Sequence, residues 1–336
     1  MRWLVRLLVS LVVAVLAAWA ATVWWIDRPV AMQPQPGAQG SAVELLVAPG
    51  MSARTVATAA VAAGVQTDPR LLFAWFRVSG DARLIKAGSY EFEPGTTPRQ
   101  LLNKLVRGEQ AQRSLVLVEG WTAGQVLAAV QASPHLTQDL DGVTLDGLMA
   151  RLGLPQVNAE GRFFPDTYRF ARRTPASVVL KQAAQAMERQ LNAAWEGRAP
   201  DTPLQSAEEL LILASIVEKE TGLESDRPMV AGVFTNRLRI GMRLQTDPAV
   251  IYGLGDGYDG RLRRTHLESD TPYNTYTRAG LPPTPIAMPG EASLLAAARP
   301  AQTKAMYFVS RGDGSSHFSA TLGEHNAAVR RFILKR

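Results

Sequence analysis

The sequence predicts an α+β protein, with a single N-terminal transmembrane helix, a small subdomain of order βααβ, and a larger mixed α+β domain that contains a cleft. Two observations support this fold class. A single uncharged apolar run lies near the N-terminus, and short strand and helix patterns without a repeat follow it. A chain of 336 residues, 46% of them hydrophobic, is long enough for two modest folded domains behind that helix.

The apolar run at 7–26 is expected to be a transmembrane anchor. It holds 18 apolar residues among 20 and no charge, and a helix of that length rises about 30 Å, the thickness of a bilayer's hydrocarbon core. Arg2 and Arg6 precede it, so the positive-inside bias places the N-terminus in the cytoplasm and the rest outside. The segment AWA at 18–20 also fits a signal-peptidase site, which leaves cleavage as an alternative. Both interpretations export the chain.

The composition excludes several classes of protein. With no cysteine, the chain has no disulfide, no thiolate metal site and no cysteine nucleophile. A net charge of +6 is too small and scattered for a nucleic-acid-binding protein. The four histidines lack metal-ligand spacing, so we expect neither a metal nor another cofactor. An exported chain without cysteine is ordinary in a bacterial periplasm.

Two parts follow the apolar run. Residues 27–41 contain Pro, Gly and Gln without periodicity, which indicates a linker. The next part, 42–110, has the pattern strand, helix, helix, strand, and a further helix. Its expected elements are strands at 43–48 and 88–92 and helices at 52–63, 68–78 and 97–107. The order βααβ resembles that of the LysM fold, a small glycan-binding module.

The most informative helix is predicted between Ser206 and Gly222. Ser206 and Glu209 form a capping box, and apolar residues on almost all sides indicate a buried helix. Glu218 falls on a face of mostly small residues, where the adjoining surface could be a groove. A carboxyl desolvated there would have a raised pKa and could donate a proton near neutral pH. The alternative is a helix-end glutamate in solvent or paired with arginine; Glu220, roughly 160° around the helix, is treated as a decoy.

Other segments rich in polar and aromatic residues are candidates for the walls of a cleft. The proline-rich stretch 270–290 cannot form regular structure, and long ordered loops of this kind are often binding surfaces. Tyr and Asn side chains suit sugars, because rings stack on pyranose faces and amides bond hydroxyl and acetamido groups. The segment 160–170 could equally be an ordinary turn anchored by aromatic residues. The candidate binding residues are Asp166, Tyr168, Gln245, Asp247, Asn274, Tyr276, Glu324 and Asn326.

Five ordered motifs resemble the endolytic murein transglycosylases, the MltG or YceG-like family. They are EGRFFPDTY (160–168), LASIVEKET (213–221), LQTDPAVIYG (244–253), PYNTYTRAGLPPTPIAMPG (272–290) and HFSATLGEHN (317–326). In that family the glutamate of the IVEKE segment is the catalytic acid/base, which the resemblance assigns to Glu218. One departure is Thr284, where the family commonly has glycine. If that glycine needs a positive φ, threonine would strain the loop by about 1 kcal/mol or more.

The resemblance implies a protein of the bacterial inner membrane that faces the periplasm. Its substrate would be the glycan strand of peptidoglycan, cut internally between N-acetylmuramic acid and N-acetylglucosamine. The predicted parts are a cytoplasmic N-terminus (1–6), the transmembrane anchor (7–26), the linker (27–41), a LysM-like subdomain (42–110), a connecting region (111–154) and the catalytic transglycosylase domain (155–336).

The implied mechanism needs a single carboxyl. Glu218 would protonate the glycosidic oxygen and then take the proton of the sugar's own 6-hydroxyl, which attacks to close a 1,6-anhydro ring. Such an enzyme would end or release nascent strands, and peptidoglycan synthases are its expected protein partners. Two alternatives stay open: a non-catalytic peptidoglycan-binding scaffold for the synthases, and a hydrolytic muramidase in which Asp166 or Asp247 is the second carboxylate.

Overall fold

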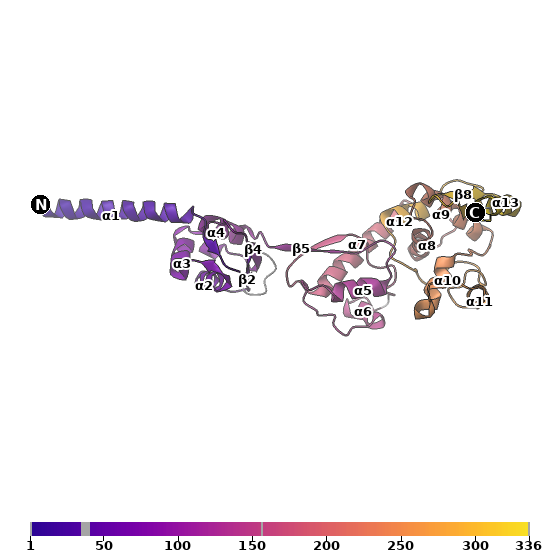
Figure 1. Cartoon of the computed structure of the whole chain (residues 1–336), viewed down its shortest axis with the longest axis horizontal. Helices are drawn as coiled ribbons and strands as arrows, with labels where there is room; N and C mark the ends of the chain where they lie inside the picture. Colours follow the sequence, from indigo (N-terminus) through magenta and orange to yellow (C-terminus); the bar gives the residue numbers. More distant parts are fainter. Residues whose placement is uncertain (1, 35–40, 156, 335–336) are drawn as a thin grey trace. The chain divides into compact units, whose positions relative to one another are not determined.

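The computed structural model describes residues 2–34, 41–155 and 157–334 (Figure 1). The chain divides into two compact units. Unit 1 comprises Met1–Arg113 with Arg169–Arg173, and unit 2 comprises Ser114–Tyr168 with Thr174–Arg336. Both contain helices and small antiparallel sheets, so the predicted mixed α+β class is confirmed. The segment predicted as a connecting region, 111–154, lies for the most part inside unit 2.

The predicted apolar helix is present as α1 (Arg2–Ile26). Its stretch Arg6–Ile26 has a mean hydropathy of 2.3 and none of it is buried in the protein. Within the described ranges it is the one helix long and apolar enough to cross a membrane.

Apart from two strands of two residues each, unit 1 has the predicted order strand, helix, helix, strand. Strands β2 (Val43–Val47) and β4 (Gly88–Phe92) pair antiparallel, with alternate residues of β2 buried against the helices. The helices are α2 (Ala53–Ala63), α3 (Pro69–Val78), the short 3-10 helix η1 (Asp81–Arg83) and α4 (Pro98–Arg107). Local sequence sets their starts, because Ser52, Asp68 and Thr97 each cap the following helix through a side-chain oxygen.

The first part of the predicted linker, 27–41, belongs to unit 1. Strand β1 (Ala31–Met32) pairs with β3 (Val65–Gln66), and the backbone N–H of Val30 donates to the carbonyl of Thr96 at 3.1 Å. Residues 35–40 of the linker lie outside the described residues. The pairing was not visible in the sequence, because two-residue strands leave no alternation to detect.

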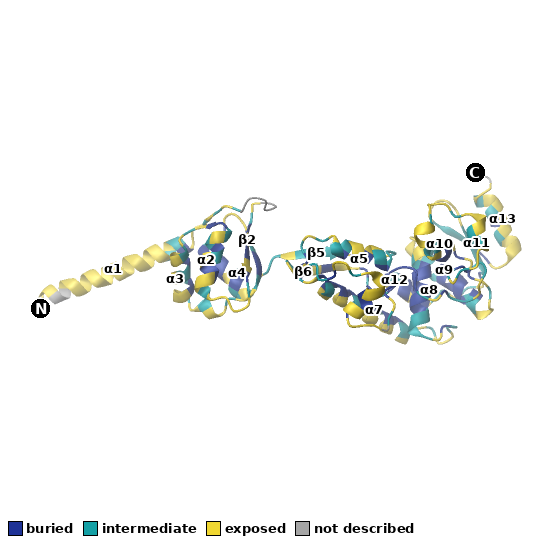
Figure 2. Ribbon diagram, turned by 90° about the horizontal axis from the view of Figure 1, so that it is seen from below, coloured by how far each residue is buried: buried dark blue, intermediate teal, exposed yellow. Residues whose placement is uncertain are grey.

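In unit 2 a set of helices packs around α8 (Ala207–Glu220). Residues Leu210–Val217 of α8 are all buried, as the sequence predicts, and α8 contacts α7, α9, α10 and α12 (Figure 2). The other helices are α5 (Ala123–Gln131), α6 (Leu145–Arg151), α7 (Ala176–Glu196), η2 (Glu224–Asp226), α9 (Arg227–Arg239), α10 (Asp247–Leu254), η3 (Gly255–Gly257), α11 (Arg264–Glu268), α12 (Glu291–Ala298) and α13 (Leu322–Phe332).

Two strand pairs complete the fold. β7 (Tyr307–Ser310) and β8 (Ser316–Ser319) form an antiparallel hairpin that contacts α13. β5 (Gln112–Val116) pairs with β6 (Thr167–Ala171), and the chain passes between the two units within these strands. α8 thus lies in unit 2 and is surrounded by helices from both earlier and later parts of the chain.

Candidate active site

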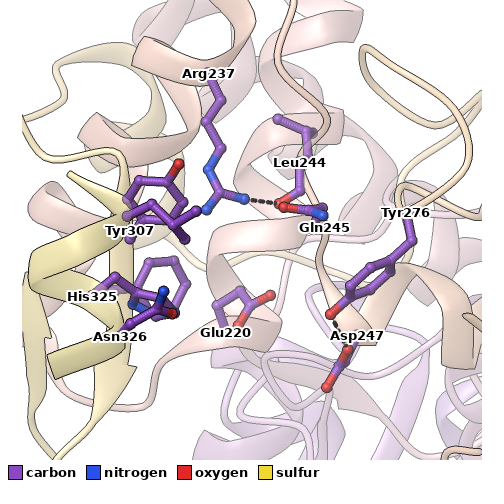
Figure 3. Close-up of a pocket in the computed structure, with 11 residues that line it drawn as sticks. Glu220, Arg237, Leu244, Gln245, Asp247, Tyr276, Tyr307, His325 and Asn326 are labelled. Atoms are coloured by element: carbon purple, nitrogen blue, oxygen red, sulfur yellow. Dashed lines mark hydrogen bonds between the residues drawn. The ribbon is translucent and has the colours of Figure 1, made fainter. Parts of the chain in front are cut away.

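A polar cavity of about 420 Å³ opens at the carboxyl end of α8, and Glu220 lines it (Figure 3). Four of the predicted binding residues line the same cavity: Gln245, Asp247, Tyr276 and Asn326. They come from the start of α10, the proline-rich loop and α13. The structure therefore brings together half of the predicted binding residues, and the glutamate beside them is Glu220 and not the predicted Glu218.

Glu220 is a cavity residue whose carboxyl has a strongly shifted pKa. Burial raises its pKa from an ordinary 4.5 to about 7, an effect that a hydrogen bond from the Thr246 hydroxyl to its carboxylate partly offsets. The negative charge of Asp247 raises this pKa further, whereas the positive charge of Arg237 lowers it. A carboxyl with a pKa near 7 can give up a proton and take one back at neutral pH.

The walls of the cavity are held by short hydrogen bonds. Tyr276 donates its hydroxyl to Asp247 at 2.6 Å, and the guanidinium of Arg237 donates to the carbonyl of Leu244 at 2.6 Å (Figure 3). Gln245 has a φ of +51°, a left-handed conformation that non-glycine residues rarely adopt. Such a conformation costs on the order of 1 kcal/mol and is typical of segments shaped for a function.

Glu218 lies on another face of α8 and does not line this cavity. Its side chain is 6% exposed; one oxygen accepts from the backbone N–H of Gly290 at 3.0 Å, and the other lies 3.7 Å from the guanidinium of Arg227. Glu119 is 4.0 Å from the same guanidinium. Burial, and the charge of Glu218, raise the pKa of Glu119. Glu218 and Glu119 thus both lie near the same nitrogen of a mostly buried arginine.

Glu160 has a pKa raised as far as that of Glu220, but it lies in a different place. Burial raises the pKa of Glu160 to about 7, although its oxygens accept from the backbone N–H of Ala123 and from the hydroxyl of Tyr252, each at 3.1 Å. It is 4% exposed and borders a separate cavity of about 310 Å³ near the start of α5. Glu160 ties α5 to α10 in unit 2.

The remaining predicted binding residues do not line the cavity of Glu220. Asp166 is exposed, and Tyr168 donates its hydroxyl to the carbonyl of Phe164 at 2.7 Å. Glu324 accepts from the backbone N–H of Thr321 in the capping box that begins α13.

Asn274 is 1% exposed and fixes the shape of the proline-rich loop. Its side-chain amide donates to the carbonyl of His266 and to that of Leu267, both at 3.1 Å, and to that of Ser269 at 2.5 Å.

Thr284, which stands where the family commonly has glycine, does not have a positive φ. The backbone strain that a positive φ would cause in a threonine is therefore absent. The Thr284 hydroxyl instead shares a 2.8 Å hydrogen bond with Tyr273.

Glu220 and Arg237 are among the cavity residues that the sequence did not predict. The sequence favours Glu218 over Glu220 because only the face of Glu218 carries a row of small residues. Arg237 is 7% exposed and follows Val230 and Phe234 on the buried face of α9. The available signal was an arginine at helical spacing from buried apolar residues, because an arginine is rarely buried unless its charge is paired. Within the described residues, no three His, Asp or Glu side chains lie close enough to hold a metal ion.

Comparisons with known proteins agree on one family. The model of the YceG-like family matches residues 45–331. A Bacillus subtilis protein named endolytic murein transglycosylase is 33% identical over 270 residues, which cover 74% of this chain and 73% of that protein. A Streptococcus pneumoniae protein of the same name is 25% identical over 296 residues, and the match spans about half of its length (53%).

A solved structure is similar as well. The 2.6 Å crystal structure of a yceG-like protein from Listeria monocytogenes superposes with a TM-score of 0.54 and 29% identity, over 86% of this chain and all of that one. The resemblance seen in the five motifs is therefore confirmed, and the chain belongs to the YceG-like family.

Proposed function

We propose that this protein is an endolytic lytic transglycosylase of the bacterial inner membrane. It cleaves the bond between N-acetylmuramic acid and N-acetylglucosamine inside peptidoglycan strands and leaves 1,6-anhydro ends. The observation that carries the proposal is the position of the Glu220 carboxyl at the wall of a polar cavity, where desolvation raises its pKa to about 7. The names of the Bacillus and Streptococcus relatives support the same activity.

The reaction requires one carboxyl that acts twice. Protonated, it donates to the glycosidic oxygen while the bond from that oxygen to C1 of the muramic acid breaks, and the acetylglucosamine leaves with a hydroxyl. The resulting carboxylate takes the proton of the 6-hydroxyl, whose oxygen bonds to C1 and closes the anhydro ring. The carboxyl ends protonated again, and no water is consumed. Hydrolytic glycosidases differ, because they need a second carboxylate as base or nucleophile.

The geometry favours Glu220 over Glu218 for this role. Glu220 borders the cavity, where a glycan oxygen can reach it, and its pKa suits both proton transfers. Glu218 is instead held by Arg227 and by the backbone of Gly290. The family resemblance pointed to Glu218, and that assignment stays a prediction that variants of the two glutamates decide.

The other cavity residues suit glycan binding. Tyr276 occupies one oxygen of Asp247 and leaves the second oxygen able to accept from sugar hydroxyls. Gln245 and Asn326 carry amides that can bond acetamido groups. These assignments extend only to the predicted residues that line the cavity. Asp166 is exposed, and Tyr168, Asn274 and Glu324 instead form hydrogen bonds with nearby backbone groups.

Unit 1 is assigned a supporting role. We propose that its βααβ part is a LysM-like module that binds the same glycan, and that α1 is a membrane anchor with the N-terminus in the cytoplasm. An anchored cleavage domain would act on strands as they emerge near the membrane and so end their elongation, close to the peptidoglycan synthases.

The test is product analysis with three matched variants. The full chain in detergent is incubated with purified glycan strands, and the products are identified by mass spectrometry. Glu220→Gln should lower turnover by roughly 10²- to 10⁴-fold, the usual value of a general acid/base. Glu218→Gln should retain most activity, and Glu224→Gln, at η2, serves as a control.

Each other outcome has a definite meaning. Loss of activity in Glu218→Gln alone would restore the prediction made from the family motif. Reducing ends in place of anhydro ends would indicate a hydrolytic muramidase, for which Asp247, in the same cavity, is the candidate second carboxylate. Binding of strands without any cleavage by the unmodified protein would leave the scaffold as the function.

A further inference from the structure

We propose that α3 lies in the membrane interface, with its apolar outer face among the acyl chains and phosphate groups of the outer leaflet, beside the last two turns of α1. The proposal rests on the membrane anchor proposed above. Unit 1 would then be partly inserted in the bilayer surface. Its proposed glycan-binding part would face the periplasm at a fixed distance from the membrane.

The outer face of α3 is apolar although it does not face the core of unit 1. Leu72 and Phe76 are buried on the inner side. On the outer side Leu71 is 54% exposed and Val78 is 78% exposed, and Leu84, just after η1, is 55% exposed. A helix that is apolar on both sides needs an apolar partner on each.

The same face shares a groove with α1. The groove has a volume of about 360 Å³, and α3 lies beside the C-terminal end of α1 in both views (Figures 1 and 2). It is lined by Trp19, Ala21, Thr22 and Trp25 of α1 and by Leu71, Ala74, Trp75 and Val78 of α3. The outer face of α3 therefore continues the surface of the predicted membrane span.

The end of α1 is fixed to unit 1, so α3 cannot move away from the span. Ile26 is 3% exposed, and directly after it Asp27 accepts two hydrogen bonds from Arg99, at 2.6 and 3.0 Å. Val30 donates its backbone N–H to Thr96 at 3.1 Å. Wherever α1 sits in the bilayer, the outer face of α3 is carried with it.

Helix length then sets the depth of α3. The 21 residues of Arg6–Ile26 rise about 30 Å, which matches the hydrocarbon core. The groove begins at Trp19, roughly 10 Å before Ile26. If α3 stayed in water, only about 20 Å of α1 would remain for the hydrocarbon, too little to span it. If α1 is fully inserted, the outer face of α3 reaches roughly 5–10 Å below the surface, the depth of interfacial helices.

The charges next to this face fit anionic phospholipid. Each of the three exposed apolar residues directly follows an exposed arginine, in the pairs Arg70-Leu71, Arg77-Val78 and Arg83-Leu84. At the end of α1 the guanidinium of Arg28 lies 3.6 Å from the ring centre of Trp24. Arginines and tryptophans in this arrangement sit at the headgroup level, where guanidinium groups bind phosphate.

The absence of cysteine allows a direct test of depth. Single cysteines replace Leu71, Val78 or Leu84 in the full chain, and Leu46, an exposed residue of β2 (41%), gives the matched control. Each is labelled with an environment-sensitive fluorophore and reconstituted in vesicles of phosphatidylethanolamine and phosphatidylglycerol. Labels at the three test positions should emit at shorter wavelength and be quenched several-fold more strongly by a shallow lipid-bound nitroxide than the label at position 46.

Two results would overturn the inference. Labels at positions 71 and 78 that are as accessible to aqueous iodide as the control would place α3 in water. Labels shielded from both iodide and the lipid nitroxide would mean that protein, such as a second copy, covers the face. Flotation of the protein with the vesicles tests the anchor separately, and glycan cleavage by the same labelled samples tests the proposed activity.

Discussion

Replacing Glu220 by glutamine is expected to stabilise unit 2 at pH 8 and to have little effect at pH 4. Burial raises the pKa of Glu220 to about 7 in the folded protein, whereas an exposed glutamate titrates near 4.5. Between these values the folded state binds the proton and the unfolded state does not, so folding stability falls as the pH rises from 4.5 to 7. At about 1.4 kcal/mol for each pKa unit, the full loss is about 3 kcal/mol above pH 7.

Glutamine removes this loss because it is neutral at every pH. It has nearly the same size and keeps an oxygen that can accept from the hydroxyl of Thr246. The positive charge of Arg237 lowers the pKa of Glu220 and so already offsets part of the cost of ionisation. We therefore expect a gain of about 1–3 kcal/mol at pH 8, together with the loss of glycan cleavage.

Glu218→Gln is the matched control and should change stability in the opposite direction. It removes the carboxylate 3.7 Å from Arg227, a side chain that is only 12% exposed. The arginine is left with Glu119 at 4.0 Å, and a poorly compensated buried charge costs about 1–3 kcal/mol.

The measurement is hydrogen exchange of the peptide 207–220, read by mass spectrometry in the full chain at several pH values after correction for intrinsic exchange rates. Amides of α8 in its buried part report the free energy of opening of unit 2. A variant Glu220→Gln that opens more readily than the parent at pH 8, or by the same amount at pH 4 as at pH 8, would refute the reasoning.

Three further substitutions test packing. Ser215→Ala leaves the buried backbone N–H of Ile286 without its 3.0 Å acceptor, so we expect a loss of about 1–3 kcal/mol and faster exchange of that amide. Gly232→Ala would bring a Cβ to 2.8 Å from the backbone oxygen of Ala301, and should lower the melting temperature through a cost of about 1–3 kcal/mol. Thr97→Ala removes the capping box of α4 and should cost about 1 kcal/mol in denaturant unfolding of unit 1.

Control variants make these three effects specific. Gly323→Ala, where an added Cβ meets nothing within 4 Å, should leave the melting temperature unchanged or slightly raised. Thr97→Ser keeps the capping oxygen and should restore stability. Equal effects of the two alanine substitutions at glycine would contradict the proposed clash, and slow exchange of the Ile286 amide in Ser215→Ala would contradict its hydrogen bond.

Local signals in the sequence predicted the elements well. A continuous apolar run predicted α1, and cap residues predicted where helices begin, as at Ser206, whose hydroxyl accepts from the backbone N–H of Glu209 at 3.2 Å. The buried character of α8 followed from apolar residues on all its sides. Each of these signals lies within one element, so no knowledge of the surrounding fold was needed.

The same local signals could not predict which glutamate in the last turn of α8 faces the cavity. Glu218 and Glu220 point to different sides of the helix, and which side opens to a cavity depends on α9, α10 and α13. Those walls come from residues 237–326, and their positions relative to α8 follow from packing over long sequence distances. On the face of small residues, the backbone N–H of Gly290 donates to Glu218 at 3.0 Å, so another segment of the chain approaches the helix there.

The last turn of α8 can form all its side-chain hydrogen bonds only after distant segments of the chain are present. Three successive side chains bind three remote segments: Glu218 bonds Gly290, Lys219 bonds the carbonyl of Gly120, and Glu220 bonds Thr246. The separations of 72, 99 and 26 residues mean that this turn cannot be completed until the chain has emerged through Gly290. Any truncation before that glycine therefore leaves the turn without its bond to Gly290.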